Sequence, residues 1–124
     1  MSVRLFRLDV ERVFRELSRY ARWAVERGAL AVVLIGSLAR GDYTAFSDAD
    51  VVIVVREDGR RPMDRIPDFL DPTFPVDLEP RVYTVDELRR MAGTRLAREI
   101  ASGVLLAGDA EVVCEALGTC GKKV

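Results

Sequence analysis

The chain contains no histidine, and only two of its 19 basic residues are lysines. The absence of histidine excludes His-ligated zinc sites, Ser-His-Asp and Cys-His catalytic arrangements, and a histidine general base. Any catalytic chemistry must therefore use carboxylates, hydroxyls, arginine or a bound metal ion.

Long apolar runs are also absent. The longest, at 29–35 and 51–55, are far too short to span a bilayer, and the N-terminus lacks the apolar core of a signal peptide. We therefore expect a cytoplasmic protein with no membrane partner. Cysteine is scarce as well. The spacing of Cys114 and Cys120 is unlike that of zinc ligands, which leaves free thiols in a reducing compartment or a disulfide in the tail.

The length and charge of the chain limit its organisation. At 124 residues it can bury one core but has no room for a separate domain that holds an acceptor. We expect residues 1–108 to form one domain and residues 109–124 to form a C-terminal helix or tail. The net charge of −1 gives no overall attraction for nucleic acid, so we expect no nucleic-acid partner.

Apolar periodicity predicts an α+β fold. Helical spacing predicts two long helices, at 10–27 and 84–102, and short helical pieces at 38–41 and 66–70. Apolar runs predict strands at 29–35, 49–55, 75–79 and 104–106, and the strand at 75–79 has a brief extension at 81–83. This order of elements predicts a small mixed β-sheet with helices packed mainly on one side.

A basic stripe lies on the first expected helix. Its members recur at helical spacing: Arg12, Arg15, Arg19 and Arg22. The stripe is either a solvated face paired with neighbouring glutamates or a contact surface for a partner. The acidic loop at 57–71 is a second candidate for such a surface.

Two carboxylates open the second expected strand. Side chains alternate along a strand, so Asp48 and Asp50 point to the same side. Two negative charges so close repel each other by roughly 4 kcal/mol at an effective dielectric near 20, and a nearby positive charge usually neutralises them. Oxygen ligands on a strand suit Mg²⁺ or Mn²⁺, which also bind phosphate. The alternative is an ordinary polar turn that enters a strand.

A Gly-Ser turn precedes these carboxylates. Gly36 allows a phosphate to approach the backbone closely, and the Ser37 hydroxyl can donate a hydrogen bond to it. Arg40 either contacts the phosphates or is an ordinary surface arginine. Ser47 either caps the turn at Asp48 or touches the nucleotide. The combination favours a site for a nucleoside triphosphate and its metal ion.

The run from Leu34 to Asp50 resembles the signature of the minimal nucleotidyltransferases, the small branch of the DNA polymerase beta-like superfamily. That signature is a strand, Gly-Ser, a spacer of about ten residues, and Asp-x-Asp opening a second strand, with a third carboxylate on a later strand. The resemblance extends over residues 13–106. Asp77, in the expected strand 75–79, is the candidate third carboxylate, and Glu79 is an auxiliary candidate of the same strand parity.

The resemblance implies an α+β nucleotidyltransferase fold and a reaction that uses two Mg²⁺ ions, which Mn²⁺ could replace. Asp48 and Asp50 would bind both ions. Asp77 would complete one of the two metal sites and act as the base for the acceptor hydroxyl. Gly36 and Ser37 would hold the β- and γ-phosphates, so that pyrophosphate is the leaving group.

The same resemblance implies a protein partner. Small members of the family act beside a helical HEPN protein as a toxin–antitoxin pair and adenylylate a tyrosine of that partner. We therefore expect an antitoxin that uses ATP or another nucleoside triphosphate and works in a hetero-oligomer. Two alternatives remain open: a non-catalytic module that neutralises its partner by docking, and a transferase that acts on a small molecule or an RNA end.

Overall fold

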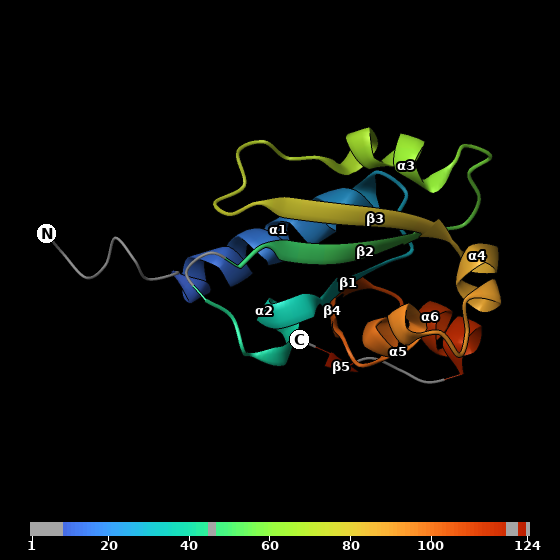
Figure 1. The fold of residues 1–124 in the computed structure, drawn as a ribbon. Coiled ribbons are helices and arrows are strands. Elements are labelled where there is room, and N and C mark those ends of the chain that lie inside the picture. The colour runs from blue at the N-terminus through green and yellow to red at the C-terminus, as the bar shows by residue number, and fades with distance from the viewer. Residues whose placement is uncertain (1–8, 45–46, 119–121, 124) are drawn as a thin grey trace, which may run out of the picture.

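The computed structural model describes residues 9–44, 47–118 and 122–123 (Figure 1). Its helices are α1 (Val10–Glu26), α2 (Gly36–Arg40), α3 (Pro62–Arg65), the 3₁₀ helix η2 (Ile66–Phe69), α4 (Val85–Arg90), α5 (Arg95–Ala101) and α6 (Ala110–Leu117). Its strands are β1 (Ala31–Ile35), β2 (Ala49–Val55), β3 (Leu78–Thr84), β4 (Val104–Gly108) and β5 (Lys122–Lys123).

One mixed sheet organises the fold, with the strand order β3-β2-β1-β4-β5. β1 is antiparallel to both β2 and β4, whereas β2 runs parallel to β3 and β4 runs parallel to β5. β1 is buried along its whole length, because it is the central strand and both of its faces are covered. The expected α+β class with a small mixed sheet is confirmed.

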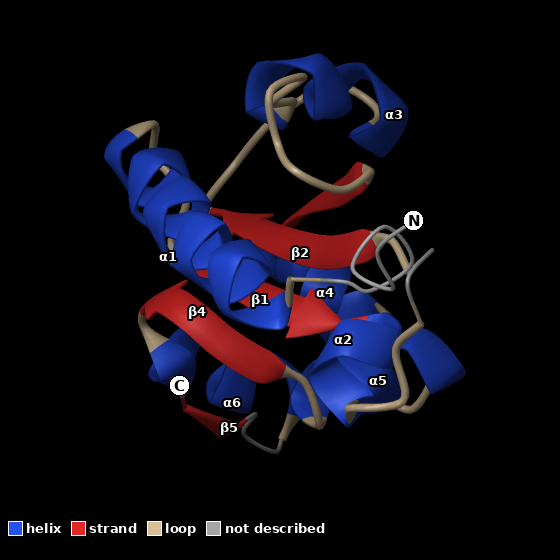
Figure 2. Ribbon diagram, turned by 90° about the vertical axis from the view of Figure 1, so that its left-hand side faces the viewer, coloured by secondary structure: helices blue, strands red, loops and turns tan. Residues whose placement is uncertain are grey.

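Helices cover both faces of this sheet (Figure 2). Alternate side chains of a strand point to opposite faces. On one face, Leu34 of β1 packs in a cluster with Leu17 of α1. On the other face, Val33 packs in a cluster with Leu88 of α4 and with residues of α5 and α6. The helices are therefore shared more evenly between the faces than we expected, because α1 alone covers a large part of one face.

α1 agrees closely with the expected helix. Its N-cap is Asp9, whose carboxylate accepts a hydrogen bond from the Arg12 backbone N–H at 3.1 Å. All four arginines of the basic stripe are exposed, and Arg19 forms an ion pair with Glu16 one turn earlier. Neither α1 nor any other helix in the described part of the chain is long and apolar enough to cross a membrane.

The long helix expected at 84–102 is in fact two helices. Thr84 begins α4 with a capping box, in which its hydroxyl accepts from the Glu87 N–H and the Glu87 carboxylate accepts from the Thr84 N–H. The chain then breaks at Gly93, which adopts a φ of 89°, and Thr94 caps α5 separately. The prediction of one long helix was wrong because apolar residues recur at helical spacing on both sides of Gly93, which hid the end of the first helix.

The third strand begins later than the expected 75–79. β3 pairs in parallel with the whole of β2, from Leu78 beside Ala49 to Thr84 beside Val55. It therefore continues through Pro80, which a strand accepts at the edge of a sheet because the missing N–H leaves no gap in the ladder. The brief extension expected at 81–83 is therefore part of β3 itself, and the expected strand and its extension are joined through Pro80.

The C-terminal part adds to the same core. α6 buries Val113 and Ala116 among residues of the central strands, although the division at residue 108 stays a prediction. Cys114 in α6 is disulfide-bonded, so the free thiol that we considered there is not found. Cys120 lies outside the described residues.

Arg65 is a charged side chain in the interior, with 3% of its surface exposed. Its guanidinium donates to the Glu87 carboxylate at 2.6 Å, to the Val82 carbonyl at 3.2 Å and to the Asp58 carbonyl at 2.9 Å. These bonds fasten the segment between β2 and β3 onto β3 and α4. The segment carries η2 and the chain that leads to Asp77, so its position matters for the site described below.

We expect Arg65→Ala to lower the free energy of unfolding by about 3 kcal/mol, because it leaves three backbone carbonyls without this donor and Glu87 without its buried ion-pair partner. The matched control is Arg61→Ala, whose side chain is 83% exposed and pairs only with Asp64 within the described residues. That change should cost less than about 1 kcal/mol. Urea denaturation measures both, and equal losses would contradict the structural role of Arg65.

Candidate active site

The residues expected to form the site meet at one end of the sheet. Because β1 and β2 are antiparallel, the end of β1, where Gly36 begins α2, lies beside the start of β2, where Asp48 and Asp50 are found. Asp77 immediately precedes β3, which is the next strand across. The carboxylates of β2 therefore lie between the Gly-Ser turn and Asp77, and Figure 1 shows the starts of β2 and β3 together, near α2.

Asp50 and Glu79 lie side by side on β2 and β3. The parallel register pairs these two residues directly. Directly paired residues on neighbouring strands place their side chains on the same face of the sheet. A hydrogen bond between the two carboxyl groups raises the pKa of Glu79. Glu79 is therefore next to the Asp-x-Asp motif, a proximity that only the register reveals.

Asp48 and Asp77 lie beside the Asp50–Glu79 pair, at the end of the sheet where β2 and β3 begin. The backbone N–H of Ala49 donates to the Asp77 carbonyl at 2.8 Å, which joins the two segments just before the strands begin. Asp48 is half-buried and Asp77 is exposed. Asp77 thus precedes β3 instead of lying within a strand at 75–79, which corrects our expectation about its local structure.

Negative charge accumulates at this end of the sheet. Burial raises the pKa of the Asp48 carboxyl, and the charges of Glu79 and Asp77 raise it further. The pKa of Glu79 is raised by its hydrogen bond to Asp50, by burial and by the charge of Asp50, while Arg81 acts in the opposite direction. Each upward shift means that the ionised carboxylate is disfavoured as long as no cation is present. The cluster is therefore arranged to gain from binding positive charge.

Gly36 is held directly against one of these carboxylates. Its φ is 79°, and a Cβ at this position would lie 2.6 Å from Oδ2 of Asp50, closer than real Cβ atoms approach. Only glycine satisfies both the backbone conformation and the close approach. The glycine expected to approach a phosphate thus also leaves room for the Asp50 carboxylate.

We expect Gly36→Ala to weaken Mg²⁺-dependent ATP binding by about tenfold or more, because the new methyl group must displace the Asp50 carboxylate. Gly41→Ala is the matched control, since Gly41 directly follows the same short helix with a φ of 86°, but an added Cβ there meets no atom within 4 Å. Both variants should lose roughly 1 kcal/mol of stability from left-handed strain. Calorimetric titration measures the affinities, and an equal loss in both variants would refute the role of Gly36.

Two serines organise the loop that joins α2 to β2. The Ser37 hydroxyl donates to the Ser47 hydroxyl oxygen at 3.0 Å, and the Thr44 N–H donates to the same oxygen at 2.7 Å. These contacts hold Ser47 against Ser37 and Thr44, and its expected role as a cap of the turn at Asp48 stays a prediction. The phosphate-binding roles of Ser37 and Ser47 stay predictions.

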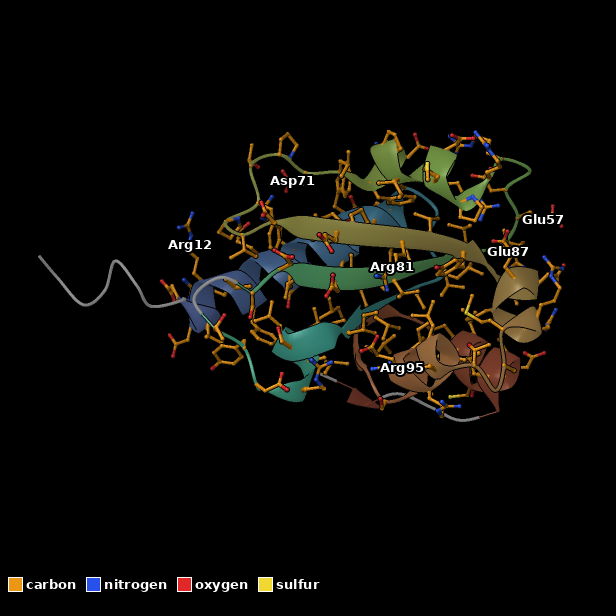
Figure 3. The ribbon with its side chains drawn as sticks, viewed as in Figure 1. Arg12, Glu57, Asp71, Arg81, Glu87 and Arg95 are labelled. Carbon is orange, nitrogen blue, oxygen red and sulfur yellow. The ribbon has the colours of Figure 1, made fainter. Side chains whose placement is uncertain are left out.

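Arginines lie on both sides of the carboxylates. Arg40 forms ion pairs at 3.2 Å with Asp42 and Glu99, which are surface contacts, and its phosphate role stays a prediction. Sequence reasoning missed Arg81, which follows Glu79 by two residues on β3 and therefore shares its face of the sheet. Figure 3 shows the exposed Arg81 side chain on the side of β2 and β3 where α5 lies. Strand parity with Glu79 was the signal that could have identified it.

The donor set of this cluster suits a hard divalent cation. Among the described residues, no three His, Cys, Asp or Glu side chains form a ready-made metal-binding group. Mg²⁺ commonly binds one or two carboxylates and completes its shell with substrate phosphates and water. Asp50 beside Glu79, with Asp48 near both, fits an ion that arrives together with a nucleotide. The three-carboxylate set of Asp48, Asp50 and Asp77 stays a prediction.

Comparisons with known proteins agree with this geometry. The family model described as a nucleotidyltransferase domain matches residues 12–102, which is most of the chain. A crystal structure of a proposed nucleotidyltransferase from Sulfolobus solfataricus aligns with a TM-score of 0.52 and 22% sequence identity, over 77% of this chain and 84% of that chain. At this identity the likeness shows the fold alone. No curated protein matches the sequence significantly.

Proposed function

Because this chain belongs to the nucleotidyltransferase domain family, we propose that it transfers AMP from ATP to a hydroxyl group, with Mg²⁺ as cofactor. We further propose that the acceptor is a tyrosine of a helical HEPN-type partner and that the chain acts as its antitoxin. The observation that carries the transfer proposal is the placement of Asp50 beside Glu79 and against Gly36 at one end of the sheet. Carboxylates and a phosphate-accessible turn thus meet in one place.

The proposed reaction is a displacement at the α-phosphorus of the nucleotide. The acceptor oxygen forms a bond to this phosphorus, the bond from phosphorus to the bridging oxygen breaks, and pyrophosphate leaves. The acceptor proton passes to the Asp77 carboxylate, which is exposed at the edge of the cluster. The Gly36–Ser37 turn would hold the β- and γ-phosphates on the other side of β2.

The carboxylates on β2 would hold the metal ions. Asp48 and Asp50 would bind Mg²⁺, with Asp77 as a third ligand and Glu79 available beside Asp50. Bound Mg²⁺ neutralises the triphosphate and the developing charge on the leaving group. Arg81 would add positive charge on the same face of β3, where it already opposes the upward pKa shift of Glu79.

The two surfaces considered for a partner differ in how far their charges are already paired. In the loop at 57–71, Asp58 and Asp68 both pair with Arg60, and Asp64 pairs with Arg61. On α1, Arg19 pairs with Glu16, whereas the other three stripe arginines have no ion pair within the described part of the chain. The α1 stripe therefore supplies more unneutralised charge, and we propose it as the surface that meets the partner.

Co-expression with the product of the neighbouring gene tests the proposal, which requires that product to be a helical HEPN-type protein. A stable hetero-oligomer should form, and intact-mass spectrometry should show one or more AMP additions on a tyrosine of the partner. The additions should disappear in the Asp48→Asn plus Asp50→Asn variant. If the partner is bound and silenced with no added mass, the chain is a docking antitoxin and the transfer proposal is wrong.

A further inference from the structure

The outer face of α1 is a surface that the proposed transfer chemistry does not use. The four arginines of the basic stripe are exposed, and they lie on the side of the helix away from its buried residues: Val13, Leu17, Tyr20, Ala21 and Ala24. Arg12 and Arg22 are ten residues apart, which is roughly 15 Å along the helix axis. Figure 2 shows no described element over this side of α1. The stripe is therefore open to another molecule.

A hollow of about 260 Å³ opens beside the stripe, between α1 and the chain at 70–73. Arg19 is a member of the stripe and also lines this hollow, so the two features form one continuous surface. The other walls include Tyr20, Trp23 and Leu70. Leu70 is 47% exposed, although it is a large apolar side chain. Exposed apolar surface with charged residues around it is typical of a protein contact site.

The charged groups of the hollow already have partners, whereas most of the stripe does not. Arg19 forms an ion pair with Glu16. The Asp71 carboxylate accepts from the backbone N–H of Thr73 at 3.0 Å and from its hydroxyl at 2.6 Å. The other three stripe arginines form no ion pair with any described residue. An occupant should therefore bring negative charge to the stripe and an uncharged, apolar side chain to the hollow.

A second copy of this chain does not match this surface. In a symmetric pair each copy presents the same patch, so one basic stripe would face another. A contact between the stripe and a different face of the second copy leaves one stripe free, and it repeats into a ring or a filament. The occupant should therefore be a different molecule.

Nucleic acid could pair its phosphates with the arginines, but it does not match the hollow. The Arg27 guanidinium already lies over the Trp23 ring, 4.8 Å from its centroid, and the Tyr20 ring packs beside it, so a base has little room to stack there. The Asp71 carboxylate in the wall would also repel phosphates. A protein that carries carboxylates next to an apolar side chain matches both features.

We propose that this surface docks an acidic amphipathic helix of another protein, with carboxylates at three- and four-residue spacing and one large apolar side chain beside them. The inference rests on the proposed function, because it gives the chemistry of the partner that α1 meets there. The carboxylates pair with Arg12, Arg15 and Arg22, and the apolar side chain enters the hollow against Trp23 and Leu70. The ion pairs orient the helix, and the buried anchor supplies most of the affinity.

Binding of a designed peptide tests this surface without any transfer chemistry. The probe is a fluorescently labelled, alanine-based helical peptide with four glutamates spaced as the stripe arginines are and one phenylalanine beside them. It contains no tyrosine, serine or threonine, so it cannot act as an acceptor. We expect saturable binding in fluorescence anisotropy, which weakens as the salt concentration rises. A control peptide of the same composition, with its glutamates scattered around the helix, should bind more weakly; equal affinity of the two peptides would contradict the spacing.

Arg12→Gln plus Arg22→Gln should weaken peptide binding about fivefold at low salt, the factor expected when two exposed ion pairs are lost. The matched control is Arg56→Gln plus Arg90→Gln, which removes the same charge from two exposed arginines outside α1. Its affinity for the peptide should stay at the parent value. Equal weakening by the two variants would mean that the peptide responds only to net charge, and it would overturn the inference.

Leu70→Ala should also weaken binding about fivefold, because part of the apolar wall is removed. Met63→Ala is the matched control, since Met63 is 75% exposed but does not line the hollow. A peptide with alanine in place of its phenylalanine should be almost insensitive to Leu70→Ala, since the two changes remove the same contact. Independent, additive losses would contradict the placement of the anchor in the hollow.

Three further outcomes would overturn the inference: no saturable binding at millimolar peptide, tighter binding of a single-stranded RNA oligonucleotide than of the peptide, or self-association of the protein in sedimentation that the Arg12 and Arg22 variant abolishes. Affinity for ATP with Mg²⁺ is measured separately on the same protein. Peptide binding without ATP binding would refute the proposed transfer function and leave the docking surface intact. ATP binding without peptide binding would refute the docking surface alone.

Discussion

Neutralising both carboxylates of the motif, in the Asp48→Asn plus Asp50→Asn variant, should abolish Mg²⁺-dependent ATP binding and lower nucleotidyl transfer by several orders of magnitude. Each substitution removes a charged oxygen that we propose as a metal ligand, and it leaves the packed core unchanged. Asp48 directly precedes β2 at one end of the sheet, and Asp50 is only half-buried. Calorimetric titration of ATP with and without Mg²⁺ measures the loss.

The same variant should be more thermally stable than the parent protein when no metal is bound. The pKa values of Asp48 and Glu79 are raised in the folded state, so these groups favour folding most below their unfolded pKa values. That contribution is lost as the pH rises through the folded pKa values. At pH 7 the ionised cluster therefore opposes folding, and removing two charges relieves it. The stability gain should vanish at a pH below the unfolded carboxyl pKa values.

The control replaces two exposed carboxylates at the other end of the sheet, in Glu57→Gln plus Asp86→Asn. Glu57 follows the end of β2, and Asp86 lies in the first turn of α4 (Figure 3 labels Glu57). This variant removes the same net charge without touching the cluster, so ATP affinity should stay at the parent value. Unchanged ATP binding in the Asp48 and Asp50 variant would refute the metal-site assignment.

Asp77→Asn should separate chemistry from binding. We expect it to keep most of the ATP affinity, because Asp77 is exposed at the edge of the cluster, while transfer falls by roughly 100- to 10,000-fold, the contribution of a positioned general base. Single-turnover transfer to the partner at saturating ATP measures the chemical step.

Glu79→Gln is the informative comparison, because Glu79 pairs with Asp50 and Asp77 does not. We expect it to weaken Mg²⁺-dependent ATP binding more than Asp77→Asn does, and to reduce the transfer rate less. Full transfer activity in Asp77→Asn would move the role of base to Glu79. An equal loss of ATP affinity in both variants would indicate that Asp77 acts mainly as a metal ligand and less as a base.

Local signals in the sequence were enough to predict several helices and strands. The cap at Asp9 and the apolar spacing behind it define α1, and the continuous apolar runs around 31–35 and 49–55 define the central strands. The Gly-Ser and Asp-x-Asp motif was visible in the same way, because its residues lie close together in the chain. Such features depend on backbone preference and side-chain period, which neighbouring residues largely determine.

Other features depended on partners far along the chain. β3 runs as one strand through Pro80 beside the whole length of β2, a pairing between residues far apart in the chain. The ion pair between Arg40 and Glu99, which are 59 residues apart in the chain, joins α2 to α5. No pattern within a short window contains this information.

The sequence by itself determined the α+β class and the presence of a carboxylate motif after a Gly-Ser turn, because each is encoded by residues within one element or one loop, and the order of the elements predicted the mixed sheet. Only the tertiary structure decided that Glu79 stands beside Asp50 and that Gly36 presses against that carboxylate. The physical reason is strand register: which side chains share a face and an edge is decided when distant strands pair.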